Sequence, residues 1–387
     1  MNQTGKHGYR LILERKGMNN ITQIEYLRET ITLAKQVDPR LVRDNPRVGA
    51  VLVNSLGQIV GKGCHEKWGE AHAEVNAIND AIQGGHNPSE CTLYVSLEPC
   101  SHVGKTPPCT SLILEKGIKK VVFASADPNP HVAGMEVLKS AGVDVLHILV
   151  EEALDLNKRF FINHLFGRPF VIVKAAVTKN GMMADAEGNS KWITGTESRK
   201  HVHNVLRENV DAILSTAKTV LKDNATLNIR IGSKSKELNC VVVDKNLALL
   251  NNTNLNIHQP RNHSKLILVS DNIKELDRLP SHVETIKGNY IAGNVNLSEL
   301  LRDIYLKYKI TSLLVEAGPT LCKSLLNAGL VDELVVFTGQ KVFPANERYA
   351  GFKSEAYPNF QLVQTMNFEN DVCNYYSDNS WKELLRK

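Results

Sequence analysis

The sequence predicts an α/β protein of two domains, and three observations lead to that prediction. The chain has 387 residues, which is more than one hydrophobic core usually organises. In both halves, short apolar runs alternate with segments of helical periodicity, the β-α-β rhythm of a largely parallel sheet covered by helices. A Gly-Arg-Pro step at 167–169 interrupts this rhythm and is typical of a hinge between domains.

The first half supplies the clearest periodicity. Apolar residues recur at helical spacing near the start, and two short strands then flank an Asn-Ser-Leu-Gly turn at 54–57. A strand-helix alternation follows up to the hinge. The expected helices are at 21–37, 71–82, 106–117, 134–141 and 151–163, and the expected strands at 48–53, 58–61, 92–97, 120–125 and 143–149.

The second half starts with an apolar run at 170–176 and continues as a second α/β set. The stretch 233–262 is rich in Asn and Lys, so we expect an irregular surface excursion around the short strand at 240–244. The two halves share no motif, which excludes an internal repeat. The expected strands are at 170–176, 210–215, 240–244, 265–270, 312–316 and 333–337, with a helical run at 321–330.

The most informative motif lies in the first half and joins His72 with two Pro-Cys steps, at Cys100 and Cys109. One imidazole and two thiolates are three ligands for tetrahedral Zn²⁺, with the fourth position open for water. Glu74, two residues after the histidine, stands where a carboxylate can move a proton from that water to a ring nitrogen and a leaving amine. An H-x-E followed by P-C and a second Cys is the signature of zinc deaminases.

Two other interpretations of these residues exist. A structural zinc site usually has four protein ligands in paired C-x-x-C spacing, whereas eight residues separate Cys100 from Cys109 here. Buried structural cysteines are common, but they do not explain an H-x-E at the start of an amphipathic run. His102 is an alternative fourth ligand, although a solvent-facing loop position is expected for it.

Composition excludes several classes of protein. The net charge of +5 is scattered, and 6% aromatic residues form no cluster that suits a nucleic-acid track. Seven cysteines, an odd and unevenly spaced set, do not form a disulfide framework. No apolar run approaches the ~18–20 residues that span a bilayer. We therefore expect a cytoplasmic enzyme without a membrane or nucleic-acid partner, and the sequence leaves a homo-oligomer open.

The first residues carry no recognisable chemistry. The segment 1–16 is charged throughout and lacks the apolar centre of a signal peptide. Chain ends of this kind are commonly disordered. Residues 1–19 are therefore expected to be a flexible extension before the first domain.

Motifs in both halves resemble the bifunctional riboflavin-biosynthesis family, a pyrimidine deaminase fused to a 5-amino-6-(5-phosphoribosylamino)uracil reductase. The resemblance runs from about residue 20 almost to the C-terminus. In the first half it rests on NPRVG at 45–49, GEAHAE at 69–74, LEPCSHVGKTPPC at 97–109 and DPNP at 127–130. In the second half it rests on SKWIT at 190–194, LR at 206–207, DAIL at 211–214, TVL at 219–221, LNIR at 227–230 and VEAGPTL at 315–321.

The resemblance implies a fold and a function for each half. Residues 20–166 would form a cytidine-deaminase-like α/β/α domain with one Zn²⁺ per chain. Residues 167–387 would form a dihydrofolate-reductase-like α/β domain that uses NADPH. The first domain would deaminate 2,5-diamino-6-ribosylamino-4(3H)-pyrimidinone 5′-phosphate, and the second would reduce the ribosyl group of the product to ribityl.

The resemblance also implies site residues in the second half. The carboxylate nearest the hydride-transfer site would be Asp223, a candidate catalytic residue. Positions that match substrate contacts are Ser190, Arg207, Leu227, Arg230 and Glu316. Positions that match nucleotide contacts are Ala176, Trp192, Thr219, Asp223, Gly318, Pro319, Thr320, Leu321, Cys322, Lys323 and Ser324.

Physical chemistry supports part of this assignment. A guanidinium binds phosphate as a planar fork, which suits Arg207 and Arg230 to a phosphorylated substrate, although an Arg at a helix end is more often a solvated charge. The Gly-Pro-Thr step at 318–320 precedes a helical run. Its amides can face an anion, or they can belong to an ordinary helix start with Pro in the first turn.

The second half departs from the family pattern at four places. The pattern Ser-Leu-Asp-Gly is Thr-Lys-Asn-Gly at 178–181, Asp-Asp-Pro is Asp-Asn-Ala at 223–225, a glycine is replaced within Ser-Thr-Ala at 215–217, and Asp-Ser is Asp-Lys at 244–245. A zinc deaminase with a decayed, scaffold-only reductase domain is therefore an alternative to the bifunctional enzyme. A nucleic-acid-editing deaminase would need the aromatic-lined strand channel that this composition lacks.

Overall fold

A computed structural model describes residues 22–231, 234–259, 261, 263–272, 279–351 and 357–386. The chain forms two compact units, Met1–Leu165 with Lys382–Lys387, and Phe166–Trp381. The last six residues thus group with the first unit. The expected extension 1–19 lies outside the described residues. Within the described ranges, no helix is both long and apolar enough to cross a membrane.

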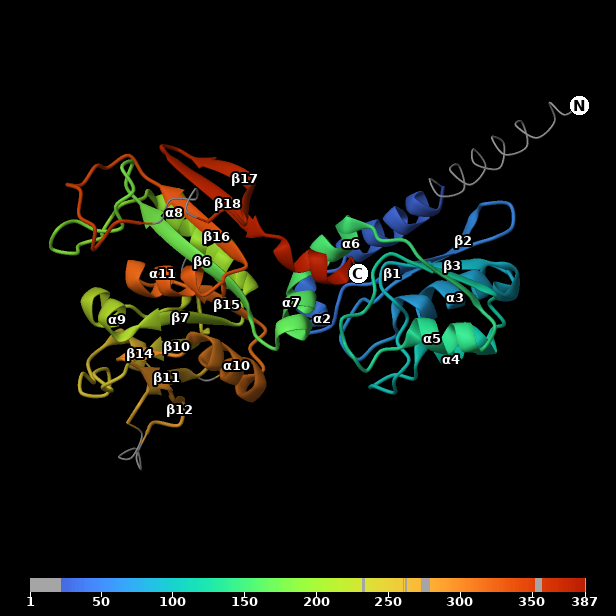
Figure 1. Cartoon of the computed structure of the whole chain (residues 1–387), viewed down its shortest axis with the longest axis horizontal. Helices are drawn as coiled ribbons and strands as arrows, with labels where there is room; N and C mark the ends of the chain where they lie inside the picture. Colours follow the sequence, from blue (N-terminus) through green and yellow to red (C-terminus); the bar gives the residue numbers. More distant parts are fainter. Residues whose placement is uncertain are drawn as a thin grey trace, which may run out of the picture. The chain divides into compact units, whose positions relative to one another are not determined.

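The first unit is built on a five-stranded sheet (Figure 1). The strand β1 pairs antiparallel with β2 and β3, whereas β3, β4 and β5 run parallel. In spatial order the strands are β2 (Ile59–Cys64), β1 (Gly49–Val53), β3 (Thr92–Val95), β4 (Lys120–Phe123) and β5 (Asp144–His147).

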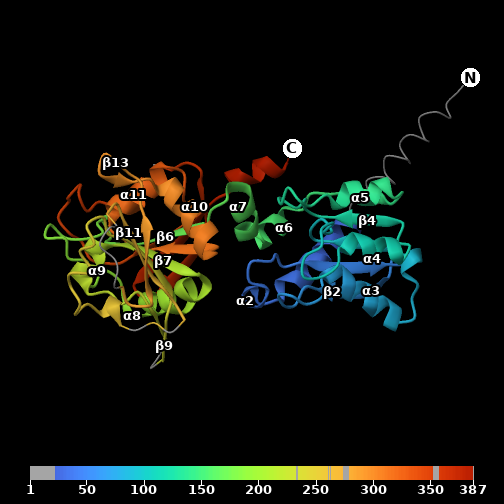
Figure 2. The same ribbon diagram turned by 90° about the horizontal axis from the view of Figure 1, so that it is seen from below.

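Helices cover both faces of this sheet, because its central strands are apolar on both sides. Side chains alternate along β1: Ala50 and Leu52 pack into one core, Val51 and Val53 into the other. The first face carries α3 (Ala73–Gln83), α4 (Cys109–Glu115) and α5 (Gly134–Ser140), which lie in a row (Figure 2). The second face carries the helix 22–35 and α6 (Glu151–Leu156). A short helix, α2 (Pro39–Val42), precedes β1.

Two glycines of β2 fix the position of α3. A Cβ on Gly61 would lie 2.3 Å from the Ala77 carbonyl oxygen, and one on Gly63 would lie 2.5 Å from the Ala73 carbonyl oxygen. Since no side chain fits, the helix backbone rests directly on the strand. The first turn of α3, which begins the candidate zinc motif, is therefore held rigidly against the sheet.

Two expected helices of the first half differ from those observed. The helix expected at 106–117 begins only at Cys109, because Pro107 and Pro108 precede it in a loop. The helix expected at 151–163 divides at Asn157 into α6 and α7 (Lys158–Phe166). The Asn157 side chain accepts a hydrogen bond from the Arg47 amide (2.9 Å) and donates one to the Arg47 carbonyl (2.8 Å), which replaces helix continuation by a tertiary contact.

The second unit contains a nine-stranded sheet. The strands from β12 to β16 run parallel, and β18 and β17 add an antiparallel hairpin at one edge. The order is β12 (Val283–Lys287), β11 (Leu266–Ser270), β10 (Asn239–Val243), β7 (Ala212–Thr216), β15 (Ser312–Val315), β6 (Phe170–Val177), β16 (Glu333–Thr338), β18 (Asp371–Asp378) and β17 (Phe360–Phe368).

Its main core forms where α10 (Leu297–Tyr308) and α11 (Pro319–Asn327) pack on apolar strand residues such as Val171 and Leu214. The helix α8 (Thr196–His201) continues into a π-helical turn, Val202–Leu206, and then a 3₁₀ turn, Arg207–Asn209. Such turns are frequent at functional sites. The remaining elements are α9 (Ala217–Asp223) and the short strands β8 (Ile229–Ile231), β9 (Lys234–Lys236), β13 (Tyr290–Ile291) and β14 (Asn294–Val295).

The segment expected to be a hinge is anchored inside the second unit. Arg168 donates two hydrogen bonds, of 2.7 and 2.8 Å, to the carboxylate of Asp332. The same carboxylate accepts the Val171 amide at 2.7 Å. This buried pair fixes the start of β6 beside the start of β16.

Candidate functional site

Three predicted metal ligands lie together in the first unit. His72 is the N-cap of α3, Cys109 is the first residue of α4, and Cys100 follows β3. The His72 Nδ1 atom lies 3.5 Å from the Cys100 Sγ and 3.3 Å from the Cys109 Sγ. One donor atom from each of the three residues lies within 4.8 Å of the other two. The β-α topology thus brings a strand end and two helix starts to one point.

The geometry of these atoms fits a zinc ion. Bonds of 2.0–2.3 Å in a tetrahedron place a nitrogen and a sulfur ligand about 3.5 Å apart, close to the two separations found here. The other ring nitrogen of His72, Nε2, lies 3.1 Å from the Thr106 hydroxyl oxygen. That contact leaves Nδ1 as the nitrogen directed at the sulfurs, which is how outer contacts orient metal-binding histidines.

The pKa values of the two cysteine thiols favour the binding of a cation. A hydrogen bond from the Cys109 thiol, with help from His72 and the Cys109 amide, lowers the pKa of Cys100 to about 4. The pKa of Cys109 is raised, because Cys100 accepts its proton and because the residue is buried. The ligand set therefore contains a ready thiolate, and a metal ion would draw the second proton off.

Glu74 lies in the first turn of α3 and is 4% exposed. Burial and the neighbouring charge of Cys100 raise the pKa of this carboxyl above its ordinary value of 4.5. A carboxyl with a raised pKa beside a metal-binding trio is suited to taking up and releasing protons. His102, the alternative fourth ligand, is exposed and is not one of the three grouped donors.

Two further polar groups next to the trio were not predicted. His65 is buried, packs edge-on against the His72 ring, and its Nδ1 lies 3.1 Å from the Ala71 carbonyl. Asp127 lies in the DPNP motif, and its pKa is raised to about 7, mainly by burial and also by Glu98. The motif drew attention to this segment, but no spacing rule connects either residue to the zinc ligands.

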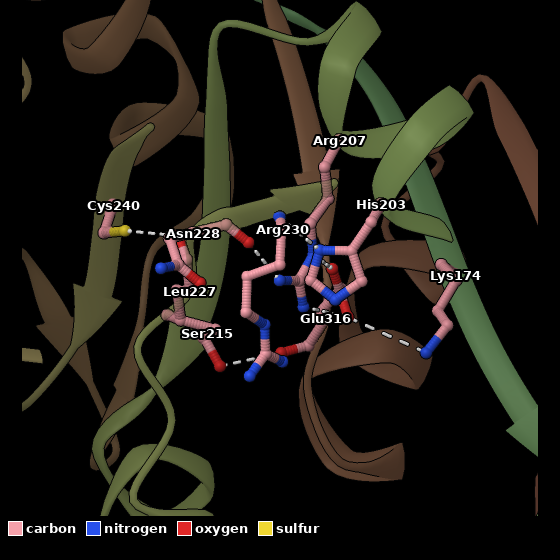
Figure 3. A network of polar contacts seen from close by, with 9 residues as sticks. All are labelled: Lys174, His203, Arg207, Ser215, Leu227, Asn228, Arg230, Cys240 and Glu316. Atoms are coloured by element: carbon pink, nitrogen blue, oxygen red, sulfur yellow. Dashed lines mark hydrogen bonds and ion pairs between the residues drawn. The ribbon is translucent and has the colours of Figure 1, made fainter. Parts of the chain in front are cut away.

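A second polar cluster lies in the second unit, around Glu316 (Figure 3). Glu316 directly follows β15 and accepts two hydrogen bonds from the Arg207 guanidinium, of 2.6 and 3.1 Å. The Lys174 ammonium, on β6, lies 3.7 Å from Oε2 of this carboxylate, the oxygen that also accepts the 3.1 Å hydrogen bond from Arg207. The third nitrogen of Arg207 donates to the Asn228 carbonyl at 2.5 Å. Arg207 is thus fully engaged within the protein.

Charges determine the protonation of this cluster. Burial alone would raise the pKa of Glu316, but Arg207 and Lys174 outweigh it and lower the pKa to about 2. Burial, together with Arg207 and Arg230, lowers the pKa of His203 to about 4. Glu316 is therefore ionised and His203 neutral at neutral pH. Consistent with a neutral ring, the Nδ1 of His203 accepts the Arg230 backbone amide at 3.0 Å.

The predicted substrate-contacting residues divide into those within this cluster and those outside it. Arg207 and Glu316 form its centre, and Arg230 lies on β8 with an exposed side chain. Leu227 is buried, adopts a positive φ of 51°, and its carbonyl accepts the Cys240 thiol at 3.3 Å. Ser190 lies in the loop before α8. Nothing in the described contacts joins it to Glu316.

The predicted nucleotide-contacting residues lie on β6, on α9, in the loop before α8 and at the start of α11. Ala176 is on β6, and Thr219 is on α9, where its amide donates to the Thr216 side chain at 3.3 Å. Asp223 ends α9, and its carboxylate lies 3.8 Å from the Lys191 ammonium. Trp192 is 58% exposed and stacks under the Arg199 guanidinium. The set Gly318–Ser324 forms the N-cap and first turns of α11.

The sequence analysis missed Lys174 and His203, and only Lys174 lies in a sequence pattern that could have indicated it. Lys174 is the single charge in the apolar strand FVIVKAAV, and a lone charge in a buried strand usually has a partner. His203 comes from the π-helical turn Val202–Leu206. A π-turn shifts the register of side chains, so helical spacing would not have directed this ring toward Arg230.

Comparisons with known proteins agree with this architecture. Residues 21–125 match the cytidine and deoxycytidylate deaminase zinc-binding region, and residues 169–374 match the RibD C-terminal domain. The first match covers the trio and Glu74, and the second covers the Glu316 cluster. The two predicted fold classes are confirmed.

Full-length relatives are similar across most of the chain. The riboflavin biosynthesis protein RibD of Aquifex aeolicus is 38% identical over 321 residues, which cover 82% of this chain and 86% of the relative. RibD of Escherichia coli is 35% identical over 344 residues, covering 85% and 92%. A crystal structure of the Thermotoga maritima diaminohydroxyphosphoribosylaminopyrimidine deaminase/5-amino-6-(5-phosphoribosylamino)uracil reductase has a TM-score of 0.74 at 32% identity, covering 93% and 99%. A structure of Acinetobacter baumannii RibD has a TM-score of 0.74 at 30% identity, with the same coverage.

Proposed function

The chain belongs to the RibD family of riboflavin biosynthesis proteins, and we propose that it catalyses two successive reactions on one phosphorylated pyrimidine. The first is hydrolytic deamination of 2,5-diamino-6-ribosylamino-4(3H)-pyrimidinone 5′-phosphate. The second is NADPH-dependent reduction of the ribosyl group to ribityl. Both family domains are present, and this favours the bifunctional enzyme over the monofunctional alternative.

The trio of His72, Cys100 and Cys109 with buried Glu74 carries the proposal for the first reaction. Zinc held by the trio would supply the Lewis acidity that makes water a nucleophile at neutral pH. Glu74 accepts a proton from the attacking water and passes it to the adjacent ring nitrogen. It then takes the second proton, from the hydroxyl group that the water has added to the ring, and gives it to the exocyclic amine. The carbon–nitrogen bond breaks, the amine leaves as ammonia, and the carbon–oxygen bond becomes a carbonyl. The raised pKa of Glu74 suits both directions of transfer.

The Glu316 cluster supports the second reaction. NADPH would supply the hydride for the ribosyl carbon. Lys174, oriented by Glu316, is placed to donate a proton to the ribosyl oxygen as the ring opens. Because Arg207 is bound to Glu316 and Asn228, it positions the carboxylate. The exposed guanidinium of Arg230 is then the better candidate for the substrate phosphate.

The residues present also fit a dinucleotide. Gly318 is the N-cap of α11, and no side chain caps this helix, so its first amides are available to a pyrophosphate. Ala176, Thr219 and Gly318 lie at or just after the carboxyl ends of β6, β7 and β15, which are neighbouring parallel strands, and ligands of such sheets bind at these ends. All seven cysteines are free thiols, which supports a cytoplasmic, reducing location for this protein.

The test follows both products with one preparation. Zinc-loaded protein given the diaminopyrimidine substrate should release ammonia, and addition of NADPH should then consume the cofactor in equal amount. Chelation of zinc should stop ammonia release, yet NADPH oxidation should continue when the deaminated intermediate is supplied. Ammonia release without any NADPH oxidation would favour the deaminase with a scaffold-only second domain.

A further inference from the structure

The segment 226–228 lies between α9 and β8 and contains a predicted substrate contact, Leu227. Its three consecutive carbonyls each accept a hydrogen bond from a side chain of a different part of the second unit. The pairs are the Thr226 carbonyl with the Arg261 guanidinium at 2.9 Å, the Leu227 carbonyl with the Cys240 thiol at 3.3 Å, and the Asn228 carbonyl with the Arg207 guanidinium at 2.5 Å. Figure 3 shows the second and third of these bonds. The segment is therefore held from inside the protein at every residue.

These bonds explain the unusual backbone of Leu227. Its φ of 51° lies in the left-handed region, which a residue other than glycine seldom adopts. Such a conformation persists where the surrounding structure fixes it, and it is frequent where a ligand binds. In the part of the chain that the structure describes, the Leu227 amide donates to no backbone acceptor. With all three carbonyls engaged inside, that amide is available to a ligand, as is the exposed guanidinium of Arg230.

Arg261 is a buried cation, 9% exposed. Its guanidinium donates to the carbonyls of Thr226 and Leu238, at 2.9 and 2.8 Å. Among the described residues no carboxylate forms an ion pair with it, whereas Arg207 is paired with Glu316. A guanidinium keeps its charge in proteins, and a buried charge without a counter-ion costs free energy. An anion near the segment 226–228 would offset that cost, and the substrate phosphate has a charge near −2 at neutral pH.

Cys240, on β10, is the donor to the middle carbonyl. Burial raises the pKa of this thiol above its ordinary value of 9.0, so the thiol keeps its proton at neutral pH and can donate it. The Leu238 carbonyl lies 3.4 Å from the sulfur, but it already accepts the Arg261 guanidinium. The Leu227 carbonyl is therefore the better acceptor for the thiol.

We propose that Arg261 is a positioning residue of the reductase. It holds the segment 226–228, with help from Cys240, so that the Leu227 amide and the Arg230 guanidinium meet the phosphate of the pyrimidine substrate. The proposal rests on the proposed reductase function and adds a residue from the stretch 233–262, where the sequence indicated only a surface excursion. Contacts to the phosphate are equal in the ground state and the transition state, so their loss raises KM and leaves kcat unchanged.

Steady-state kinetics with saturating NADPH and varied deaminated pyrimidine tests the proposal. Arg261→Met leaves two carbonyls without their donor, and it should raise KM for the pyrimidine about tenfold while kcat and the KM for NADPH stay near the parent values. Arg261→Lys keeps the charge but does not span both carbonyls as a planar guanidinium does, so its KM should be intermediate. Arg302→Met, which removes an exposed guanidinium from α10, is the control and should retain the parent KM.

Calorimetric titration with ribose 5-phosphate, the phosphorylated fragment of the substrate, measures the same effect without turnover. Arg261→Met should bind it about tenfold more weakly. Cys240→Ala should weaken binding less, because a thiol is a weak donor, and Cys240→Ser keeps a donor and should bind like the parent protein. Cys91→Ala is the matched control, since this buried thiol of the first unit donates to the Asn87 carbonyl at 3.5 Å.

The outcomes separate positioning from folding and from the proposed function. Partial unfolding of a variant would lower the apparent kcat, whereas the KM of the folded fraction would not change. A fall in kcat alone, or parent values of KM and of ribose 5-phosphate affinity in Arg261→Met, would overturn the positioning role and leave the reductase function standing. A parent protein that neither oxidises NADPH with the deaminated pyrimidine nor binds ribose 5-phosphate would overturn both.

Discussion

The two polar sites of this molecule handle buried charge in opposite ways. In the first unit, Cys100, Cys109 and Glu74 gather potential negative charge around one imidazole. In the second unit, Glu316 is already neutralised by Arg207 and Lys174.

This difference determines what each site needs from outside the chain. Burying an isolated charge costs free energy, so the first site is complete only when a cation is bound. The free energy of binding that cation then contributes to the stability of the first unit. The second site needs no ion from outside, because the pairing of Glu316 with Arg207 and Lys174 offsets the free energy lost when these charges are removed from water. The first should respond to metal removal, and the second to loss of a single partner.

The largest effect is expected from Glu74→Gln. Loss of the proton carrier should lower ammonia release by about 10²–10⁴-fold, while zinc content stays near that of the parent protein because Glu74 is not one of the grouped ligands. Zinc analysis beside an ammonia assay measures both. His72→Ala, Cys100→Ser and Cys109→Ser should lose zinc as well as activity. If Glu74→Gln lost its zinc too, the division of roles would be wrong.

Glu316→Gln tests the self-neutralised site. Removing the carboxylate leaves the buried Arg207 without its partner, which should destabilise the second unit by about 3–5 kcal/mol and abolish reduction, but not deamination. Denaturant unfolding measures the change. Glu197→Gln is the matched control, because it breaks an exposed pair with Lys200 and should change stability little.

The same carboxylate gives a pH dependence. The pKa of Glu316 is depressed to about 2 in the folded protein from an ordinary 4.5. Its contribution is therefore complete above pH 4.5 and is lost as the pH falls through about 2. The stability difference between parent and Glu316→Gln should shrink over that interval. A difference that stayed constant there would show that Glu316 is not ionised in the folded state.

Thr106→Val should have an intermediate effect, on the first site alone. The hydroxyl oxygen lies 3.1 Å from the Nε2 of His72, and loss of such an outer contact typically weakens metal binding by about 10–100-fold. Competition with a chromogenic zinc chelator measures the affinity. Thr106→Ser retains the hydroxyl and should restore it. Equal affinity in the valine variant would mean that the loop does not orient the imidazole.

The sequence predicted more of the zinc site than of the Glu316 cluster, because only the zinc site has a local sequence pattern. The zinc motif consists of rare residue types within one stretch from His72 to Cys109, and metal chemistry restricts both types and spacing. The Glu316 cluster collects common charged residues from β6, a π-helical turn and the end of β15. Only strand order brings Lys174 and Glu316 together, and no local pattern encodes that order.

The same distinction holds for the fold. Buried parallel strands such as β11 and β15 are short apolar runs, and they were predicted within a few residues. The edge strand β17 was missed, because most of its side chains are exposed and its sequence, FQLVQTMNF, lacks the regular alternation of apolar and polar residues that marks a strand with one buried face. Strand β18 was missed with it, since a hairpin at a sheet edge is specified by pairing more than by burial.

The smallest effect is expected from Asp223→Asn, and here the geometry and the family resemblance lead to different expectations. The resemblance implies a carboxylate near the hydride-transfer site. In the structure, Asp223 ends α9, pairs with Lys191 at 3.8 Å, and both side chains are partly exposed (31% and 52%). No described contact joins it to Glu316 or Lys174.

For Asp223→Asn we therefore expect NADPH to bind at most about fivefold more weakly, as for loss of an exposed ion pair, with kcat for reduction nearly unchanged. Steady-state kinetics at varied NADPH separates KM from kcat, and Asp303→Asn on α10 is the matched control. A fall in kcat beyond a hundredfold would instead place Asp223 at the reacting atoms and give the second site a carboxylate that, unlike Glu316, the protein does not neutralise.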